Sequence, residues 1–238
     1  MRRLRCVTRG LLACALAWPM AATCAAKGDE IALTGQPRSW DVHGVPFEAD
    51  GFQGARWGMS MDEVKAAIAA AWPDALATAK VQVDDAARTT ALAVTVATLA
   101  PGPGPAQVSY VFGAASHRLV AVHQTWTLPG NPDAVQRAAL LRAATTLASD
   151  LVGYQWPDFA TTRGRVTAPG ELILFAGRDF HGGGVEIRVG GVALDVELPG
   201  PVRKQAHRAA PAGPAHLRKS LVANIDHPDI YTIPPGAF

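Results

Sequence analysis

The chain has 238 residues, 49% of them hydrophobic, which is enough for one large domain or two small domains with a buried core. Its 22 basic and 20 acidic residues nearly balance. Four arginines lie within the first nine residues, and subtracting these 4 from 22 leaves 18 basic against 20 acidic residues. This slight acidic excess argues against a nucleic-acid partner, since such proteins present a strongly basic surface.

Residues 1–26 have the three parts of an export signal. An apolar run at 11–22 follows the positive start, and small residues precede a cleavage position after Ala26. The run is shorter than the roughly 20 residues that cross a membrane, so we expect no transmembrane segment in the mature chain. The sequence thus predicts a periplasmic or secreted protein. The positive start comprises Arg2, Arg3, Arg5 and Arg9.

All three cysteines, Cys6, Cys14 and Cys24, lie in this segment. The mature chain is therefore expected to have no disulfide, although its compartment is oxidising. Lipidation of Cys24 is the alternative to simple cleavage, but residues 21–23 form a poor lipobox. The stability of the mature chain must then come from its core.

The best-marked helix begins after Ser60. This serine is placed to cap the helix, and Glu63, three residues later, completes a capping box. Val64 and Ile68 share one face at helical spacing. Pro73 ends the helix because it disfavours helical geometry at the residue before it.

The residues around this cap carry a family resemblance. The stretch resembles the opening of small bacterial envelope proteins of two kinds, the outer-membrane assembly lipoproteins of the BamE/SmpA type and the β-lactamase-inhibitor-protein fold. The resemblance implies helices laid on an antiparallel sheet and a non-enzymatic function of binding other proteins. The matching residues are Trp57, Gly58, Met59, Ser60, Glu63 and Val64.

Alternating and β-branched segments predict an antiparallel sheet. After the last of them, Gly190-Gly191 predicts a two-residue turn, and 192–198 is expected to return as the second strand of a hairpin. The other expected strands lie at 81–83, 89–99, 107–112, 118–128, 171–178 and 184–189.

A second helix is expected between the two groups of strands. Asn131 is predicted to be its N-cap, with Pro132 at the first helical position. Arg137 and Arg142 are expected on its solvent side. Its predicted buried stripe consists of Leu140, Ala144, Leu147 and Leu151.

The order helix, strands, helix, strands predicts an α+β fold. We expect antiparallel sheet with two helices packed on one face, built from two helix-plus-sheet halves. An export signal is predicted at 1–26 and an extended arm at 27–51. The globular domain is predicted at 52–198, with halves at about 52–128 and 129–198. A basic, Pro- and Ala-rich linker and tail are predicted at 199–238.

The tail differs in charge from the rest. Residues 200–238 contain five basic and two acidic residues, whereas the mature chain before them contains 13 and 18. This contrast predicts a tail that binds a protein partner and can also touch an anionic membrane surface. The residues expected to make these contacts are Arg203, Lys204, Arg208, Arg218, Lys219, Ile230, Tyr231 and Ile233.

The sequence motifs that would indicate a catalytic, metal or cofactor site are incomplete or absent. The run 181–184, His-Gly-Gly-Gly, matches the oxyanion-hole motif of some esterases, but no G-x-S-x-G elbow accompanies it. Glycines between two predicted strands are typical of a turn. No paired-histidine zinc motif or phosphate-binding glycine loop is present, so we expect no metal and no cofactor. Four tryptophans, expected to pack in the core or at a sheet edge, are Trp57, Trp72, Trp126 and Trp156.

The sequence therefore predicts an exported envelope protein that binds a protein partner without catalysis. Two alternatives stay open. One is a periplasmic hydrolase with a dispersed site, and the other is a structural domain tethered to the envelope.

Overall fold

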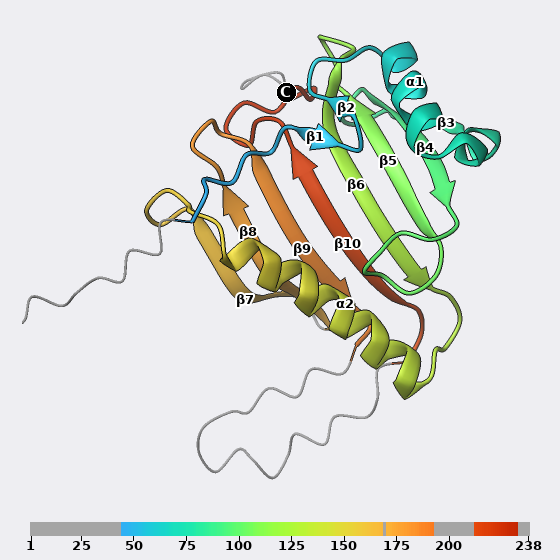
Figure 1. The fold of residues 1–238 in the computed structure, drawn as a ribbon, viewed down its shortest axis with the longest axis vertical. Coiled ribbons are helices and arrows are strands. Elements are labelled where there is room, and N and C mark those ends of the chain that lie inside the picture. Colours follow the sequence, from blue (N-terminus) through green and yellow to red (C-terminus); the bar gives the residue numbers. More distant parts are fainter. Residues whose placement is uncertain (1–43, 169, 193–211, 233–238) are drawn as a thin grey trace, which may run out of the picture. The chain divides into compact units, whose positions relative to one another are not determined.

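The structure is a computed structural model, and it describes residues 44–168, 170–192 and 212–232. The predicted α+β class is confirmed (Figure 1). The first half of the chain contains β1 (Gly51–Phe52), β2 (Ala55–Arg56), α1 (Met61–Ala71), the 3₁₀ helix η1 (Pro73–Thr78), β3 (Lys80–Asp84), β4 (Thr89–Val96), β5 (Ala106–Phe112) and β6 (Leu119–Leu128). The second contains α2 (Ala134–Val152), β7 (Thr161–Ala168), β8 (Glu171–Arg178), β9 (Gly184–Gly190) and β10 (Ala215–Val222).

Eight strands form one antiparallel sheet in the order β3-β4-β5-β6-β10-β9-β8-β7. Each half contributes a helix followed by four strands, and the two halves meet where β6 pairs with β10. Side chains of α1 and α2 enter a single core together with one face of these strands, so both helices cover the same face. β1 and β2 pair only with each other.

Strand β10 corrects the prediction of a tail beginning at 199. Residues 215–222 form a central strand between β6 and β9, with Leu217 opposite both Trp126 and Val189 (Figure 1). The predicted hairpin is also wrong, because β10 occupies the side of β9 that the prediction assigned to 192–198. Residues 193–198 lie outside the described residues. The strand was missed because Lys219 interrupts its apolar alternation.

The local signals at α1 act as expected. Ser60 Oγ accepts the amide of Glu63 at 3.4 Å, and Glu63 Oε2 accepts the amide of Ser60 at 2.7 Å. Val64 and Ile68 are fully buried. The helix ends at Ala71, two residues before Pro73.

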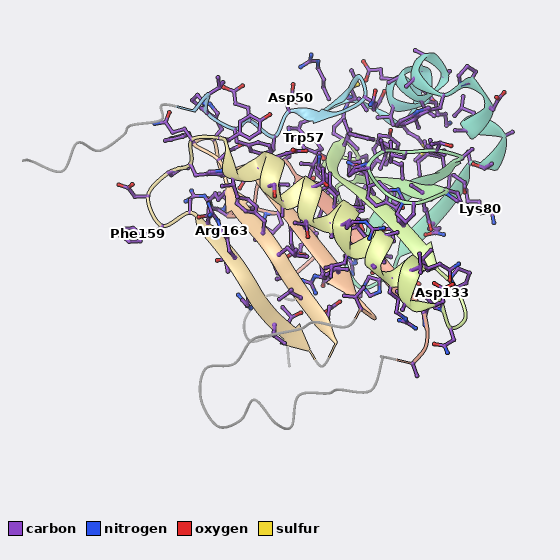
Figure 2. All side chains as sticks on the ribbon, turned by 60° about the horizontal axis from the view of Figure 1, so that its bottom comes forward. Asp50, Trp57, Lys80, Asp133, Phe159 and Arg163 are labelled. Carbon is purple, nitrogen blue, oxygen red and sulfur yellow. The ribbon has the colours of Figure 1, made fainter. Side chains whose placement is uncertain are left out.

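The start of α2 differs from the prediction. Asp133, labelled in Figure 2, is the N-cap in place of Asn131. Asp133 Oδ1 accepts the amide of Gln136 at 2.8 Å, and Gln136 Oε1 accepts the amide of Asp133 at 2.9 Å. A reciprocal capping box with a charged acceptor satisfies two amides at once, which Asn131-Pro132 cannot do.

Arg137 is a second correction at α2. It is only 5% exposed instead of lying on the solvent side. It precedes Leu140 by three residues, so helical geometry places it on the buried stripe. Its guanidinium donates hydrogen bonds to three backbone carbonyls and to the side chain of Asn131.

The four tryptophans pack in or against the core, as predicted. Trp126 is fully buried, and its Nε1 donates to the carbonyl of Leu99 at 3.0 Å. Trp156 stacks on Phe47 with 4.7 Å between ring centroids. The stack attaches the segment before β1 to the end of α2.

Candidate functional site: the uncovered face of the sheet

The face opposite the helices is the candidate site. Successive residues of a strand point to opposite faces, so the register assigns each side chain to one of them. Within the described residues, no helix lies on this second face. In the centre of the sheet the face carries Gln107, Ser109 and Val111 of β5, Ala121, His123 and Thr125 of β6, Arg218, Ser220 and Val222 of β10, and Glu186 and Arg188 of β9.

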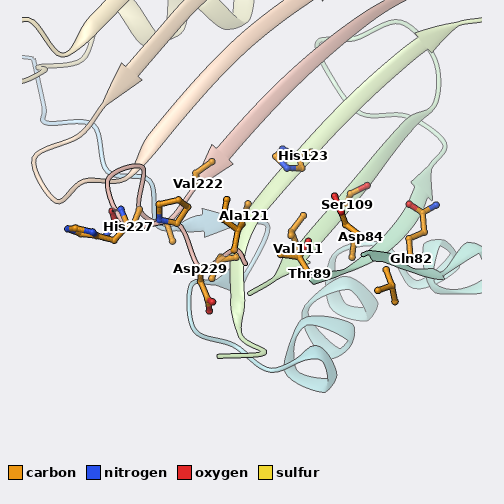
Figure 3. Close-up of a pocket in the computed structure, with 17 residues that line it drawn as sticks. Gln82, Asp84, Thr89, Ser109, Val111, Ala121, His123, Val222, His227 and Asp229 are labelled. Atoms are coloured by element: carbon orange, nitrogen blue, oxygen red, sulfur yellow. Dashed lines mark hydrogen bonds between the residues drawn. The ribbon is translucent and has the colours of Figure 1, made fainter. Parts of the chain in front are cut away.

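A hollow of about 530 Å³ lies at one end of this face, which is within the range of ligand pockets. Its floor comes from small and β-branched residues on four strands, namely Ala91, Val111, Ala121 and Val222 (Figure 3). Small side chains on neighbouring strands leave this depression in the sheet. Polar groups on its rim come from Asp84, Ser109, His123, Asn224, His227 and Asp229.

The C-terminal segment 223–232 forms one wall of the hollow. Asp229 Oδ1 and Oδ2 accept the amides of Ala115 and Ser116 at 2.9 and 3.0 Å, beside the turn between β5 and β6. Hydrogen bonds from Ser116 and from the Ala115 backbone lower the pKa of Asp229. A Cβ at Gly113 would collide with this carboxylate, so a larger residue there would displace Asp229 from these hydrogen bonds.

The end of this segment reaches the turn between β3 and β4. The amide of Tyr231 donates to the carbonyl of Ala87 at 2.8 Å, and the Arg88 guanidinium lies 3.6 Å from the centroid of the Tyr231 ring. Nearer β10, Arg178 Nη2 forms an ion pair with Asp226 at 2.6 Å. These contacts hold the segment along the strand ends.

A polar cluster of His123, Ser220 and Arg218 reaches the hollow through His123, which lines it. Ser220 Oγ accepts Arg218 Nε at 3.0 Å and lies 3.1 Å from His123 Nδ1. Arg218 Nη2 lies 3.2 and 3.4 Å from the two ring nitrogens of His123, so the guanidinium rests against the imidazole. Burial, assisted by the charge of Arg218, lowers the pKa of His123 to about 4.

An ion-pair network lies beside this cluster. Arg188 bonds Glu186 at 2.9 Å and Glu171 at 3.1 Å, and His216 Nε2 lies 3.7 Å from Glu171. A hydrogen bond from Thr167, followed by the charge of Arg188, lowers the pKa of Glu171. The carboxylates of Glu186 and Glu171 are therefore both paired with Arg188. Arg218 has no carboxylate partner within 4.0 Å among the described residues.

This cluster is a poor nucleophile site. An activated serine needs a histidine that can accept its proton, held in place by a third group. No described carboxylate is within hydrogen-bond distance of His123, and a pKa of about 4 makes the ring a weak base at neutral pH.

The glycines of the run 181–184 lie in the turn between β8 and β9 and at the first position of β9, so they serve a turn as predicted. Asp179, only 3% exposed, accepts the amides of His181 at 2.8 Å and Gly183 at 2.7 Å through Oδ1. Its Oδ2 accepts the amide of Ala49 at 3.0 Å. Two amides that an oxyanion hole would need are thus occupied by a carboxylate.

The predicted binding residues do not form one patch. Arg203, Lys204, Arg208 and Ile233 lie outside the described residues. Arg218 lies on the uncovered face, whereas Lys219 points to the helix side, where burial lowers its pKa. Ile230 lines the hollow and Tyr231 packs under Arg88.

Sequence reasoning missed Ser220 and the hollow. The available signal was the alternation of 118–128, which set His123 and Thr125 on a shared polar face. That face becomes a site only when β10 pairs with β6 and brings Ser220 opposite His123.

In the described ranges, no helix is long and apolar enough to cross a membrane. The same residues contain no group of three His, Cys, Asp or Glu side chains placed to hold a metal ion. Comparison of the chain with family models, with curated proteins and with solved structures found no match.

Proposed function

We propose that this chain is an exported envelope protein that binds a protein partner on the uncovered face of its sheet, without catalysis. The export signal at 1–26 supports the periplasmic or secreted location. The resemblance of 57–64 to envelope proteins that bind other proteins supports the same function. Sequencing the N-terminus of the exported protein tests the location, and an intact Met1 or a lipid on Cys24 would contradict it.

The observation that carries the binding function is the hollow together with Arg218, which contacts His123 on its lining. Hot spots of protein interfaces are residues that fill such depressions, and arginine is enriched among them. Arg218 has no ion pair among the described residues, while its neighbour Arg188 takes both nearby carboxylates. The site therefore fits a partner segment with an apolar side chain for the hollow, followed by a carboxylate for Arg218.

Photo-crosslinking from the two faces tests the use of this surface. A crosslinking amino acid at Gln107 lies on the uncovered face, and one at Arg142 lies on the exposed side of α2. We expect Gln107 to capture one protein in the cell envelope and Arg142 to capture none. Equal capture from both positions would contradict the proposal.

Two substitutions then test the hollow with the captured partner. Val111→Trp fills the floor, and Arg218→Gln removes the free charge. We expect each to weaken binding at least about tenfold, whereas the exposed control Arg142→Gln leaves it unchanged. Circular dichroism checks that all three variants are folded. Unchanged affinity in both folded variants would refute this mode of binding.

The hydrolase alternative rests on the 3.1 Å contact between Ser220 and His123. A fluorophosphonate probe, which reacts with activated serines, decides between the two functions. We expect no labelling of the wild-type protein, because His123 is a weak base and has no orienting acid. Labelling that disappears in Ser220→Ala would favour the hydrolase.

A further inference from the structure

Strand β3 is one edge of the sheet, and no described strand lies on its outer side. All five of its residues are exposed, and Val81 and Val83 expose 58% and 65% of their surface. Its register with β4 contains no bulge. A regular exposed edge of this kind offers unpaired backbone N–H and C=O groups to another strand.

The opposite edge, β7, is protected against such pairing. It carries Arg163 and Arg165 on either side of Gly164, and its register with β8 shifts between Val166 and Ala168. Twofold pairing of β7 about Gly164 would set Arg163 opposite the partner's Arg165. Like charges directly opposite each other destabilise a strand pair, and charges and bulges are devices that block edge pairing.

The sequence of β3, Lys-Val-Gln-Val-Asp, is complementary to itself. In an antiparallel pair centred on Gln82, Lys80 lies opposite the partner's Asp84, and Val81 lies opposite the partner's Val83. Opposite charges and β-branched pairs both stabilise facing strands. A twofold axis makes each of these contacts twice, as a closed dimer requires.

The side chains of β3 are placed for these contacts. Gln82 pairs with Ala91 on the uncovered face, so Lys80 and Asp84 lie on that side, while the two valines lie on the helix side. Lys80 stands at the outer end of the sheet (Figure 2). Asp84 Oδ1 accepts the amides of Ala86 and Ala87 at 3.0 Å each, which leaves Oδ2 for a lysine.

We propose that two copies of this chain associate through antiparallel pairing of β3 about a twofold axis at Gln82. The axis is perpendicular to the sheet, so the sheet continues through both copies and the uncovered faces point the same way. Gln82 and Asp84 also line the hollow, so the dimer has one hollow on each side of its axis. This inference does not rest on the proposed partner binding.

The dimer is expected to be weak. Stable interfaces bury about 1,200–2,000 Å², more than one five-residue strand pair provides. We expect a dissociation constant between about 10 µM and about 500 µM. Sedimentation equilibrium from about 5 to 500 µM will show whether association follows mass action.

Charge reversal identifies the surface and the register. Lys80→Asp sets two carboxylates opposite each other, and Asp84→Lys sets two ammonium groups opposite each other, so each variant should associate at least about tenfold more weakly. An equimolar mixture of the two variants pairs opposite charges at both positions and should restore the dimer. Because Asp84→Lys also removes the acceptor of the turn, circular dichroism must show that it is folded.

The matched control is Arg142→Asp on the exposed side of α2, a charge reversal away from both edges of the sheet, which should leave the dimer unchanged. Several outcomes would overturn the proposal. They are a wild-type protein that stays monomeric at about 500 µM, a dimer that Lys80→Asp does not weaken, a mixture that stays monomeric, and open-ended oligomers in place of a closed dimer.

Discussion

Replacing the buried Arg137 by methionine tests how the end of β9 and the start of β10 are held beside α2. Its Nε donates to the carbonyl of Pro132 at 2.9 Å, and Nη2 donates to Asn131 Oδ1 at 2.9 Å and to the carbonyl of Gly213 at 2.8 Å. Nη1 donates to the carbonyl of Gly191. One side chain therefore joins the start of α2 to the segments that follow β9 and precede β10.

The expected loss in the free energy of unfolding follows from these hydrogen bonds. A hydrogen bond to a charged group contributes about 1.5–3 kcal/mol, and buried carbonyls left without a donor add to the loss. Water can reach exposed Asn131, and methionine retains some packing, so the four bonds do not add fully. We expect Arg137→Met to lower the free energy of unfolding by about 3–5 kcal/mol. The free energy of unfolding of a typical domain is about 5–15 kcal/mol, so this loss would be a large part of it.

Urea denaturation measures this free energy, and Arg142→Met is the matched control. Arg142 is exposed on the same helix, so its replacement should change stability by less than about 0.5 kcal/mol. Hydrogen exchange should show the greatest loss of protection at β10. The reasoning would be refuted if Arg137→Met were as stable as the wild type, or if both variants were destabilised equally.

Three other predictions follow from the fold. The pKa of His123 is about 4 in the folded protein against 6.5 as its ordinary value, so the unfolded chain binds more protons between these values. Stability should therefore fall as pH drops from 6.5 towards 4, by at most about 3 kcal/mol, and His123→Gln should flatten this slope in pH-dependent urea titrations. Deleting 212–238 removes β10 and should abolish cooperative unfolding. Deleting 233–238 alone is the control and should leave cooperative unfolding intact. If the 1–211 fragment still unfolded cooperatively, β10 would be dispensable for the fold. Ser60→Ala removes a helix cap and should lower the free energy of unfolding by about 1 kcal/mol, and no change would mean that the cap contributes nothing.

Local patterns were sufficient for the elements whose signals lie within a few residues. The capping box of Ser60 and Glu63 marked α1, and alternation marked the strands of the first half. The glycine run 181–184 was correctly predicted as a turn. These features depend on interactions between close neighbours in sequence, which composition and periodicity record directly.

Two features could not be predicted from local patterns. β7 was missed because an edge strand exposed on both faces shows no burial alternation. Arg137 was misplaced because its charge outweighed its position on the buried stripe. The carbonyls that satisfy it come from segments beyond 190, which no local pattern reveals.

The sequence by itself determined the α+β class of the fold, the cap of α1 and the turn between β8 and β9, since these arise from short-range bonds and from the period of apolar residues. Only the tertiary structure decided that 215–222 lies at the centre of the sheet. The same pairing placed Ser220 opposite His123, put Arg218 and Lys219 on opposite faces, and completed the hollow. Its cause is long-range: Leu217 is buried between Trp126 and Val189, and that burial outweighs the Pro- and basic-rich composition around the strand.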